Sequence, residues 1–303
     1  MRMIYRTVFM GTSDFSVSIL EELARQYPVA GVITQADKPA GRGKRLTSPP
    51  VKRKAEELSL PIIQPEKLKS PEVMEQLQNW QPDFIVVAAY GKILRQNILD
   101  LPRFGCINVH ASYLPRWRGA SPIQAAILNG DDSTGVTIMV MDPGVDTGPI
   151  LAREKVSIHP TDDSITLSDK LARVGGKLLI STLDGYLSGS LAPFPQEEDG
   201  ATYAAMIQKE DGILDFSRPA VELERKVRAF IDWPGATMSF QGQPLNIRKT
   251  RVVTGKGLPG NRFVVDRFPC VNTIDGGLML LEVKPAGRNW MNGADFLRGT
   301  RDW

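Results

Sequence analysis

The sequence has little of what disulfide, zinc or histidine chemistry requires. Among 303 residues there are two cysteines, Cys106 and Cys270, and two histidines, His110 and His159. Two isolated cysteines cannot form a disulfide framework or a zinc cluster, so we expect buried thiols, no bound metal and a reducing cytoplasm. Any imidazole chemistry has only two candidates, and His159 precedes a proline in a polar stretch that is typical of a surface.

Long apolar runs and a strong charge imbalance are absent too. No run approaches the ~20 residues of a membrane-spanning helix, and residues 1–6 lack a secretory signal pattern. The formal net charge is only +3, so a surface for an anionic partner has to be local. Hydrophobic residues make up 42% and charged residues 23%, as in a globular protein with a real core. We expect a monomer without membrane attachment, with one large domain or two.

Short apolar runs alternate with helical patterns in the first half of the chain. The expected strands are 8–10, 30–33, 62–63, 84–88, 106–110 and 136–140, and the expected helices are 16–24, 51–58, 71–80, 122–128 and 164–187. Strands that are apolar throughout and separated by helices indicate a mostly parallel sheet with both faces covered. Residues 1–190 are therefore expected to form a Rossmann-like α/β domain.

The pattern changes after a polar, proline-containing segment at 191–205, which we interpret as a domain linker. One helix is expected at 219–231. Only short β-prone runs follow it, at 236–240, 245–253, 263–265, 270–274 and 278–283, and turn residues separate them. Short strands at this spacing predict a smaller antiparallel β-barrel of the oligonucleotide-binding (OB) type over residues 206–303.

The strongest chemical signal is the pair Asn108 and His110, at the carboxyl end of an expected parallel strand. Ligands of open α/β sheets bind beyond the carboxyl ends of the strands. Residues two apart on an extended chain point to the same side, so an amide and an imidazole would face one point. The alternative is that His110 is a structural hydrogen-bonding residue.

A carboxylate follows in the segment Asp142-Pro-Gly-Val-Asp146-Thr-Gly148. Its glycines and proline allow tight turns, which we expect to bring Asp146 to the same sheet edge. An amide that donates to an oxyanion, a histidine and a carboxylate that orients it make up an acyl-transfer site. Such a site needs no serine or cysteine nucleophile if the substrate supplies its own amine. A turn-forming role is the alternative for Asp146.

These residues belong to longer motifs. Asn108-Val-His110-Ala-Ser112-Tyr-Leu-Pro115-Arg-Trp-Arg-Gly119, together with Asp146-Thr-Gly148, resembles the signature of the folate-dependent formyltransferase superfamily. The resemblance implies that Asn108, His110 and Asp146 are catalytic and that 10-formyltetrahydrofolate is the co-substrate. The implied folate contacts are Ser112, Tyr113, Leu114, Pro115, Val86, Val87, Ala88, Tyr90, Asp142 and Gly144. The family usually has leucine where this chain has Tyr113, a change that concerns the wall of the pocket rather than the chemistry.

A basic segment narrows the substrate class. From residue 37 to 54 there are seven basic residues (38, 42, 44, 45, 52, 53 and 54) and one acid. Clusters of this kind bind nucleic-acid backbones with an affinity that falls with salt. The segment resembles the insertion loop that methionyl-tRNA formyltransferases place against the acceptor stem. That resemblance implies initiator methionyl-tRNA as the partner, with Arg42, Lys44, Arg45 and Lys38 as contacts. A solvated loop without a partner is the alternative.

The resemblance extends through the second half of the chain. Arg228-Ala-Phe230-Ile-Asp232-Trp233-Pro234-Gly235 is similar to a motif that opens the family's C-terminal domain, with Asp232 where proline is common. Basic residues at 225, 226, 228, 248, 249 and 251 suggest that this domain contacts tRNA as well. Two other functions stay open: formylation of an amino-sugar nucleotide, whose enzymes lack the basic insertion, and an RNA-binding protein with a degenerate catalytic half.

Overall fold

A computed structural model describes residues 4–40, 45–300 and 302–303 of the chain, with no account of the side chains at 40 and 45. The contacts divide it into two compact units, each discontinuous in sequence. The first comprises Met1–Pro122, Thr134–Ser157 and Ser168–Ala204, and the second comprises Ile123–Ser133, Ile158–Leu167 and Ala205–Trp303. Within the described residues, no helix is long and apolar enough to cross a membrane.

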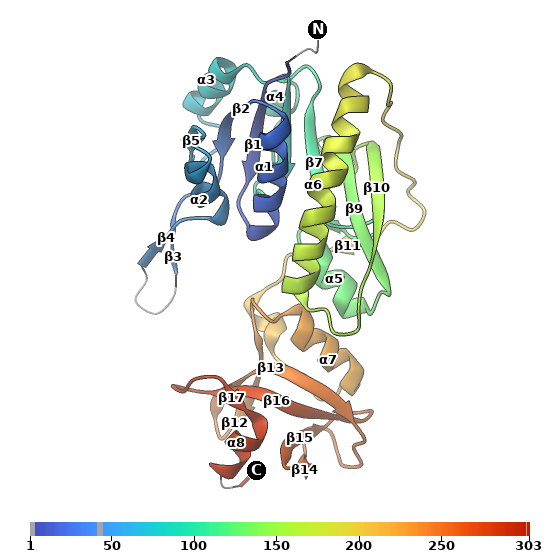
Figure 1. Ribbon diagram of the computed structural model, residues 1–303. Coiled ribbons are helices and arrows are strands. Elements are labelled where there is room, and N and C mark those ends of the chain that lie inside the picture. The colour runs from blue at the N-terminus through green and yellow to red at the C-terminus, as the bar shows by residue number, and fades with distance from the viewer. Residues whose placement is uncertain (1–3, 41–44, 301) are drawn as a thin grey trace. The chain divides into compact units, whose positions relative to one another are not determined.

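The first unit contains a seven-stranded sheet (Figure 1). In spatial order its strands are β10 (Ile150–Ser157), β9 (Ser133–Val140), β7 (Cys106–His110), β6 (Phe84–Ala88), β1 (Thr7–Gly11), β2 (Val29–Ile33) and β5 (Ile62–Ile63). The pairs from β7 through β5 are parallel, whereas β9 runs antiparallel to β7. The expectation of a mostly parallel sheet is confirmed. Strand β10 was not predicted because three consecutive charged residues, 153–155, interrupt its apolar pattern.

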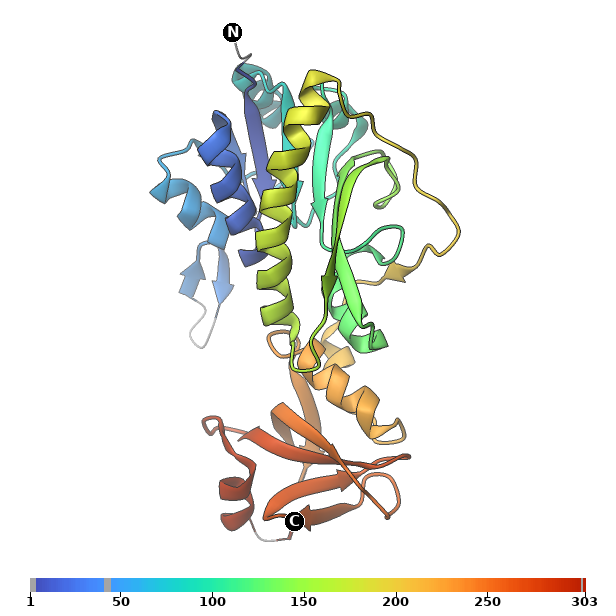
Figure 2. The ribbon, with the colours of Figure 1, turned by 45° about the vertical axis from the view of Figure 1, so that its right-hand side comes forward.

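Helices cover both faces of this sheet. They are α1 (Asp14–Gln26), α2 (Pro50–Glu57), α3 (Pro71–Trp80), α4 (Gln96–Leu99) and α6 (Ser164–Ser188). On one face, Val8, Ile85 and Cys106 of the strands join Leu77 of α3 and Ile98 of α4 in one buried cluster. On the other face α1 and α6 lie side by side, as both views show (Figures 1 and 2). Helix α6 packs closely on β7 at Gly175, where an added Cβ would lie only 2.9 Å from the Val109 side chain.

A small hairpin and a peripheral pairing complete the first unit. Strands β3 (Lys38–Ala40) and β4 (Arg45–Thr47) pair antiparallel within the basic segment. Strand β11 (Tyr203–Ala204) pairs with β8 (Arg118–Gly119), although β11 falls in the segment that we interpreted as a linker. Phe194 of the same segment exchanges backbone hydrogen bonds with Ile150, at N···O distances of 2.7 and 2.9 Å. The polar composition gave no sign of these bonds because their partners are distant in sequence.

The second unit is built on an antiparallel sheet with the strand order β12 (Ala236–Phe240), β13 (Gln243–Val253), β16 (Gly277–Pro285), β15 (Phe268–Asn272) and β14 (Arg262–Val265), with β17 (Met291–Asn292) paired to β16. Its helices are α5 (Pro122–Asn129), the 3-10 helix η1 (Lys209–Gly212), α7 (Ala220–Ala229) and α8 (Gly293–Arg298). Leu223 and Val227 of α7 pack against Val271 and Leu280 of the sheet. The expected antiparallel second half is confirmed, and closure into a barrel stays a prediction.

Candidate active site

Strand β7 presents Asn108 and His110 on one side of the sheet. The alternation of side chains puts them on the side where Cys106 enters the buried cluster, and both remain mostly buried, with 8% and 6% of their surface exposed. Val109, between them, lies on the opposite side against α6. The prediction that the amide and the imidazole face one region is confirmed.

Asp146 reaches the same region by a route that the sequence did not reveal. Because β9 is antiparallel to β7, its last residue, Val140, lies opposite Ile107. The next residue, Met141, donates from its backbone N–H to the Cys106 carbonyl at 2.7 Å. The loop 142–148 therefore starts at the amino end of β7, and the expectation that its turns bring Asp146 to Asn108 and His110 is confirmed. It reaches Asn108 and His110 only by folding back along β7.

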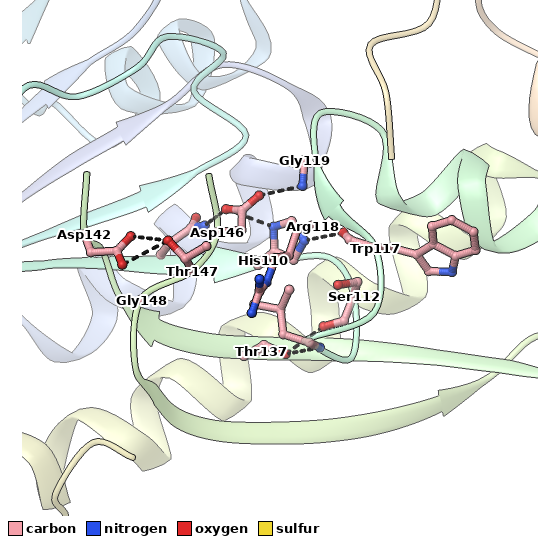
Figure 3. Close-up of polar contacts among 12 residues, drawn as sticks. His110, Ser112, Trp117, Arg118, Gly119, Thr137, Asp142, Asp146, Thr147 and Gly148 are labelled. Carbon is pink, nitrogen blue, oxygen red and sulfur yellow. Dashed lines mark hydrogen bonds and ion pairs between the residues drawn. The ribbon is translucent and has the colours of Figure 1, made fainter. Parts of the chain in front are cut away.

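One carboxylate then contacts three groups, two of them on β7 and one on β8 (Figure 3). Asn108 Nδ2 donates to Asp146 Oδ1 at 3.2 Å, and His110 Nδ1 lies 3.5 Å from the same oxygen. The backbone N–H of Gly119 donates to Asp146 Oδ2 at 2.8 Å. Asp146 itself has a φ of 54°, a left-handed conformation that costs a non-glycine residue free energy and persists where the surroundings enforce it. The site residues are thus organised around Asp146.

The second ring nitrogen of His110 has a fixed partner. His110 Nε2 lies 3.0 Å from the carbonyl oxygen of Trp117. A carbonyl oxygen only accepts hydrogen bonds, so Nε2 carries a proton in this arrangement. Nδ1 is then the ring nitrogen that faces Asp146. The described residues contain no group of three His, Cys, Asp or Glu side chains that could hold a metal ion.

The segment 112–115 is hydrogen-bonded to the sheet close to His110. Ser112 Oγ donates to the Arg116 carbonyl at 2.7 Å, so its hydroxyl already has a partner. Thr137 of β9 donates to the Ser112 carbonyl at 2.7 Å and accepts from the Leu114 N–H at 3.1 Å. Leu114 is fully buried, whereas Tyr113 is 38% exposed and lies beneath the Arg153 guanidinium, 4.7 Å from its ring centroid. The aromatic ring at 113 is thus part of a surface stack.

The segment 86–90 is also held by side chains that the sequence analysis did not single out. Val86, Val87 and Ala88 are buried in β6, and Tyr90 follows the strand. The Tyr90 carbonyl accepts from Thr12 Oγ1 at 3.0 Å and from Gln35 Nε2 at 2.9 Å. The Tyr90 ring belongs to the core, where burial raises the pKa of its hydroxyl to about 12. The backbone of this segment, rather than the ring, is what the site can use.

The loop 142–148 braces itself in a similar way. Asp142 accepts at Oδ1 from the Gly144 N–H at 3.1 Å and from Thr147 Oγ1 at 2.8 Å. These bonds explain the turn chemistry of the loop without any ligand. Asp142 and Gly144 therefore support the position of Asp146, and a role for them in folate binding stays a prediction.

Part of the basic segment is engaged in ion pairs. Lys52 Nζ lies 2.8 Å from Asp37 Oδ2, and Lys54 Nζ lies 2.8 Å from Glu21 Oε1. Hydrogen bonding from Gln64 and then from Lys52 lowers the pKa of the Asp37 carboxyl. Lys38 is exposed and donates to Gln35 Oε1 at 2.7 Å. Arg42 and Lys44 lie outside the described residues, as does the side chain of Arg45.

Comparison with known proteins gives a consistent result. The model of the formyl transferase family matches residues 5–183, and the model of the formyl transferase C-terminal domain matches residues 206–301. A methionyl-tRNA formyltransferase of Myxococcus xanthus is 48% identical over 297 residues, which cover 97% of this chain and 95% of that protein. A protein of the same name from Halorhodospira halophila is 48% identical over 306 residues, which cover 99% and 97%.

The solved structures agree on the fold. A crystal structure of HypX from Aquifex aeolicus in complex with tetrahydrofolic acid superimposes with a TM-score of 0.68 at 17% identity. The match covers 97% of this chain and 47% of the HypX chain, so this chain spans about half the length of HypX.

Proposed function

The chain belongs to the methionyl-tRNA formyltransferases within the formyl transferase family, and we propose that Asn108, His110 and Asp146 carry the reaction. In that reaction the formyl group of 10-formyltetrahydrofolate moves to the amino group of methionyl initiator tRNA. The observation that supports this assignment most strongly is the convergence of the three side chains, with Asp146 Oδ1 at 3.2 Å from the Asn108 amide nitrogen and 3.5 Å from His110 Nδ1.

The proposed reaction begins with attack of the amine, and Asn108 and His110 stabilise the charge that then develops. The uncharged methionyl amine attacks the formyl carbon, a new C–N bond forms, and the carbonyl electrons move onto oxygen. The Asn108 amide has two N–H groups, of which Asp146 uses one, so the other can donate to the oxyanion. Because Nε2 already carries a proton, His110 Nδ1 donates only in the doubly protonated ring, where it adds a second donor together with a positive charge. The amide and the imidazole thus stabilise the tetrahedral intermediate.

A proton must then cross the site. The attacking nitrogen becomes positively charged in the intermediate, and N10 of the folate needs a proton to leave as tetrahydrofolate. The carboxylate of Asp146 accepts hydrogen bonds and faces His110 Nδ1, so the pair can take the proton from the amine and return it to N10. When the bond between the formyl carbon and N10 breaks, the products are formylmethionyl-tRNA and tetrahydrofolate.

The two braced segments give the folate a site within the first unit. We assign its pterin to backbone groups of residues 86–90 and 142–145, with 112–115 alongside. Thr12 and Gln35 hold the first segment, and Thr147 holds the second. Ordered backbone donors and acceptors suit a pterin ring, because little conformational entropy is lost when it binds.

The basic segment 37–54 supplies positive charge for the phosphates of the tRNA. Because Lys52 and Lys54 are paired with carboxylates, the assignment rests on Lys38, Arg42, Lys44 and Arg45. The domains in this account are 1–190 for catalysis, 191–205 for the connection and 206–303 for a further tRNA contact. We also propose a monomer and a cytoplasmic location, and the two free, buried cysteines fit a reducing compartment.

The acceptor is the part of this proposal that an assay decides most directly. We would incubate the protein with 10-formyltetrahydrofolate and offer methionyl initiator tRNA, methionyl elongator tRNA or an amino-sugar nucleotide in separate reactions. Formylation of the initiator tRNA at a kcat/KM well above the other two is expected. Formylation of the amino-sugar nucleotide alone would assign the chain to sugar modification, and the His110→Ala variant serves as the background control in every reaction.

A further inference from the structure

We propose that Gln196 is a positioning residue for Asp146, an inference that rests on the proposed role of Asp146 in formyl transfer. Gln196 lies on the segment 194–204, far from the catalytic motifs in sequence. Its Nε2 donates to the Asp146 carbonyl at 2.8 Å and to the Gly148 carbonyl at 2.8 Å. The amide therefore donates hydrogen bonds to the loop 142–148 on both sides of Thr147.

Arg118 fixes which end of the amide faces the loop. Arg118 Nε donates to Gln196 Oε1 at 3.1 Å, and a guanidinium has no acceptor, so Oε1 must point toward it and the NH₂ group toward the two carbonyls. The Arg118 side chain is fully buried and also donates to both carboxylate oxygens of Glu198, at 3.0 and 3.1 Å. The buried guanidinium of Arg118 thus fixes the orientation of the Gln196 amide.

The same segment also holds the partners of the catalytic side chains. Thr202 accepts at Oγ1 from the Trp117 N–H at 2.9 Å, and its carbonyl accepts from the Arg118 N–H at 2.8 Å. Trp117 supplies the carbonyl that His110 binds, and Gly119 supplies the N–H that Asp146 binds. The segment 194–204 therefore connects residues 117–119 with the 142–148 loop.

The backbone conformation of Asp146 is unfavourable, which is why these hydrogen bonds from Gln196 matter. A left-handed φ of 54° is unfavourable for an aspartate, so the loop will relax unless several contacts oppose that relaxation. Gly119 and Asn108 hold the carboxylate, whereas Gln196 holds the main chain on which the carboxylate is mounted. A misplacement of about 1 Å at a reacting group can cost on the order of 100-fold in rate.

Two substitutions separate the donor function from packing and charge. Gln196→Glu keeps an acceptor for Arg118 and loses both donors, and Gln196→Met keeps the length and loses all hydrogen bonds without adding charge. For both we expect kcat to fall about 10- to 100-fold, with unchanged KM for tRNA. Glu197→Gln, an exposed neighbour on the same segment, is the matched control and should behave as wild type. A loss in Gln196→Glu alone would show that charge is responsible and would overturn the proposal.

A double-variant cycle distinguishes positioning from general destabilisation. Single-turnover rates are measured for Gln196→Met in the wild-type and in the Asp146→Asn background, together with the thermal unfolding midpoint. If Gln196 acts through Asp146, its substitution should slow Asp146→Asn by less than about twofold. Losses that multiply would show a structural role. If wild type itself forms no formylated tRNA, the proposed function fails, whereas an active wild type with fully active Gln196 variants refutes only this inference.

Discussion

The backbone N–H of Gly119 donates to Asp146 Oδ2 at 2.8 Å, so one oxygen of this carboxylate is held by the main chain rather than by a side chain. The other oxygen of Asp146 faces Asn108 and His110. In the proposed mechanism, this division leaves Oδ1 for the chemistry and Oδ2 for the position of the carboxylate.

Replacement of the amide donor should affect the chemical step. In Asn108→Ala, we expect kcat to fall roughly 10²- to 10³-fold, the usual consequence of removing one oxyanion donor. Binding of the folate should change little, because the amide acts on charge that develops in the transition state. Pre-steady-state formation of formylated tRNA checks the rate. A tenfold rise in KM with unchanged kcat would assign Asn108 to ground-state binding instead.

The backbone donor can be tested through its own residue. A Cβ on Gly119 would lie 2.5 Å from the Ala204 carbonyl oxygen, and Gly119 has a φ of 113°. Gly119→Ala should displace the N–H from Asp146 and lower kcat at least about tenfold, or ~1.4 kcal/mol.

Gly189→Ala is the matched control for that variant, since Gly189 has a φ of 77° and nothing within 4 Å of an added Cβ. It carries a similar backbone cost without a clash, so it should lower the unfolding midpoint slightly and leave kcat unchanged. Equal kcat values in the two variants would mean that the Gly119 contact is dispensable.

The basic segment should act on the tRNA alone. Arg42→Leu and Lys38→Ala are expected to raise KM for tRNA, and each lost phosphate contact should reduce the slope of log affinity against log salt by about 0.9. Lys177→Ala, at an exposed position of α6, is the control for net charge. An unaltered KM for tRNA in Arg42→Leu would refute the assignment of this segment.

The cysteines should be unreactive in the folded protein. Burial raises the pKa of the Cys106 thiol to about 12 and that of the Cys270 thiol to about 11. A raised thiol pKa means that the neutral form persists well above pH 8, and only the thiolate is a good nucleophile. Titration with a chromogenic disulfide at pH 8 should therefore label neither thiol until a denaturant is added. Rapid labelling in the native state would contradict their burial.

The sequence predicted the elements whose signal is local. Strands β6 and β7 and helix α3 have the predicted bounds, because the signal for each lies in its own residues. The two strands are runs of buried residues, and the helix begins at a proline. The shared orientation of Asn108 and His110 followed from the alternation of side chains along one strand. The sequence could not predict that Asp146 approaches by folding back along β7, because the direction of β9 depends on its partner rather than on its composition.

Contacts between distant segments carried no sequence signal either. Gly119 acts through a backbone N–H, Trp117 through a carbonyl and Gln196 through contacts with residues about fifty positions away in the chain. A main-chain donor looks the same in every residue type, so neither composition nor spacing marks it. The segment 191–205 was interpreted as a linker for the same reason, since its hydrogen bonds are made with residues 117–119 and with the 142–148 loop.

The most direct test of the central claim is single-turnover formyl transfer by His110→Ala, with folate binding measured on the same preparation. The variant is expected to bind the folate as wild type does and to form formylmethionyl-tRNA at least about 10²-fold more slowly. A His110→Ala protein that binds folate and transfers the formyl group at the wild-type rate would contradict the assignment of Asn108, His110 and Asp146 as the catalytic set.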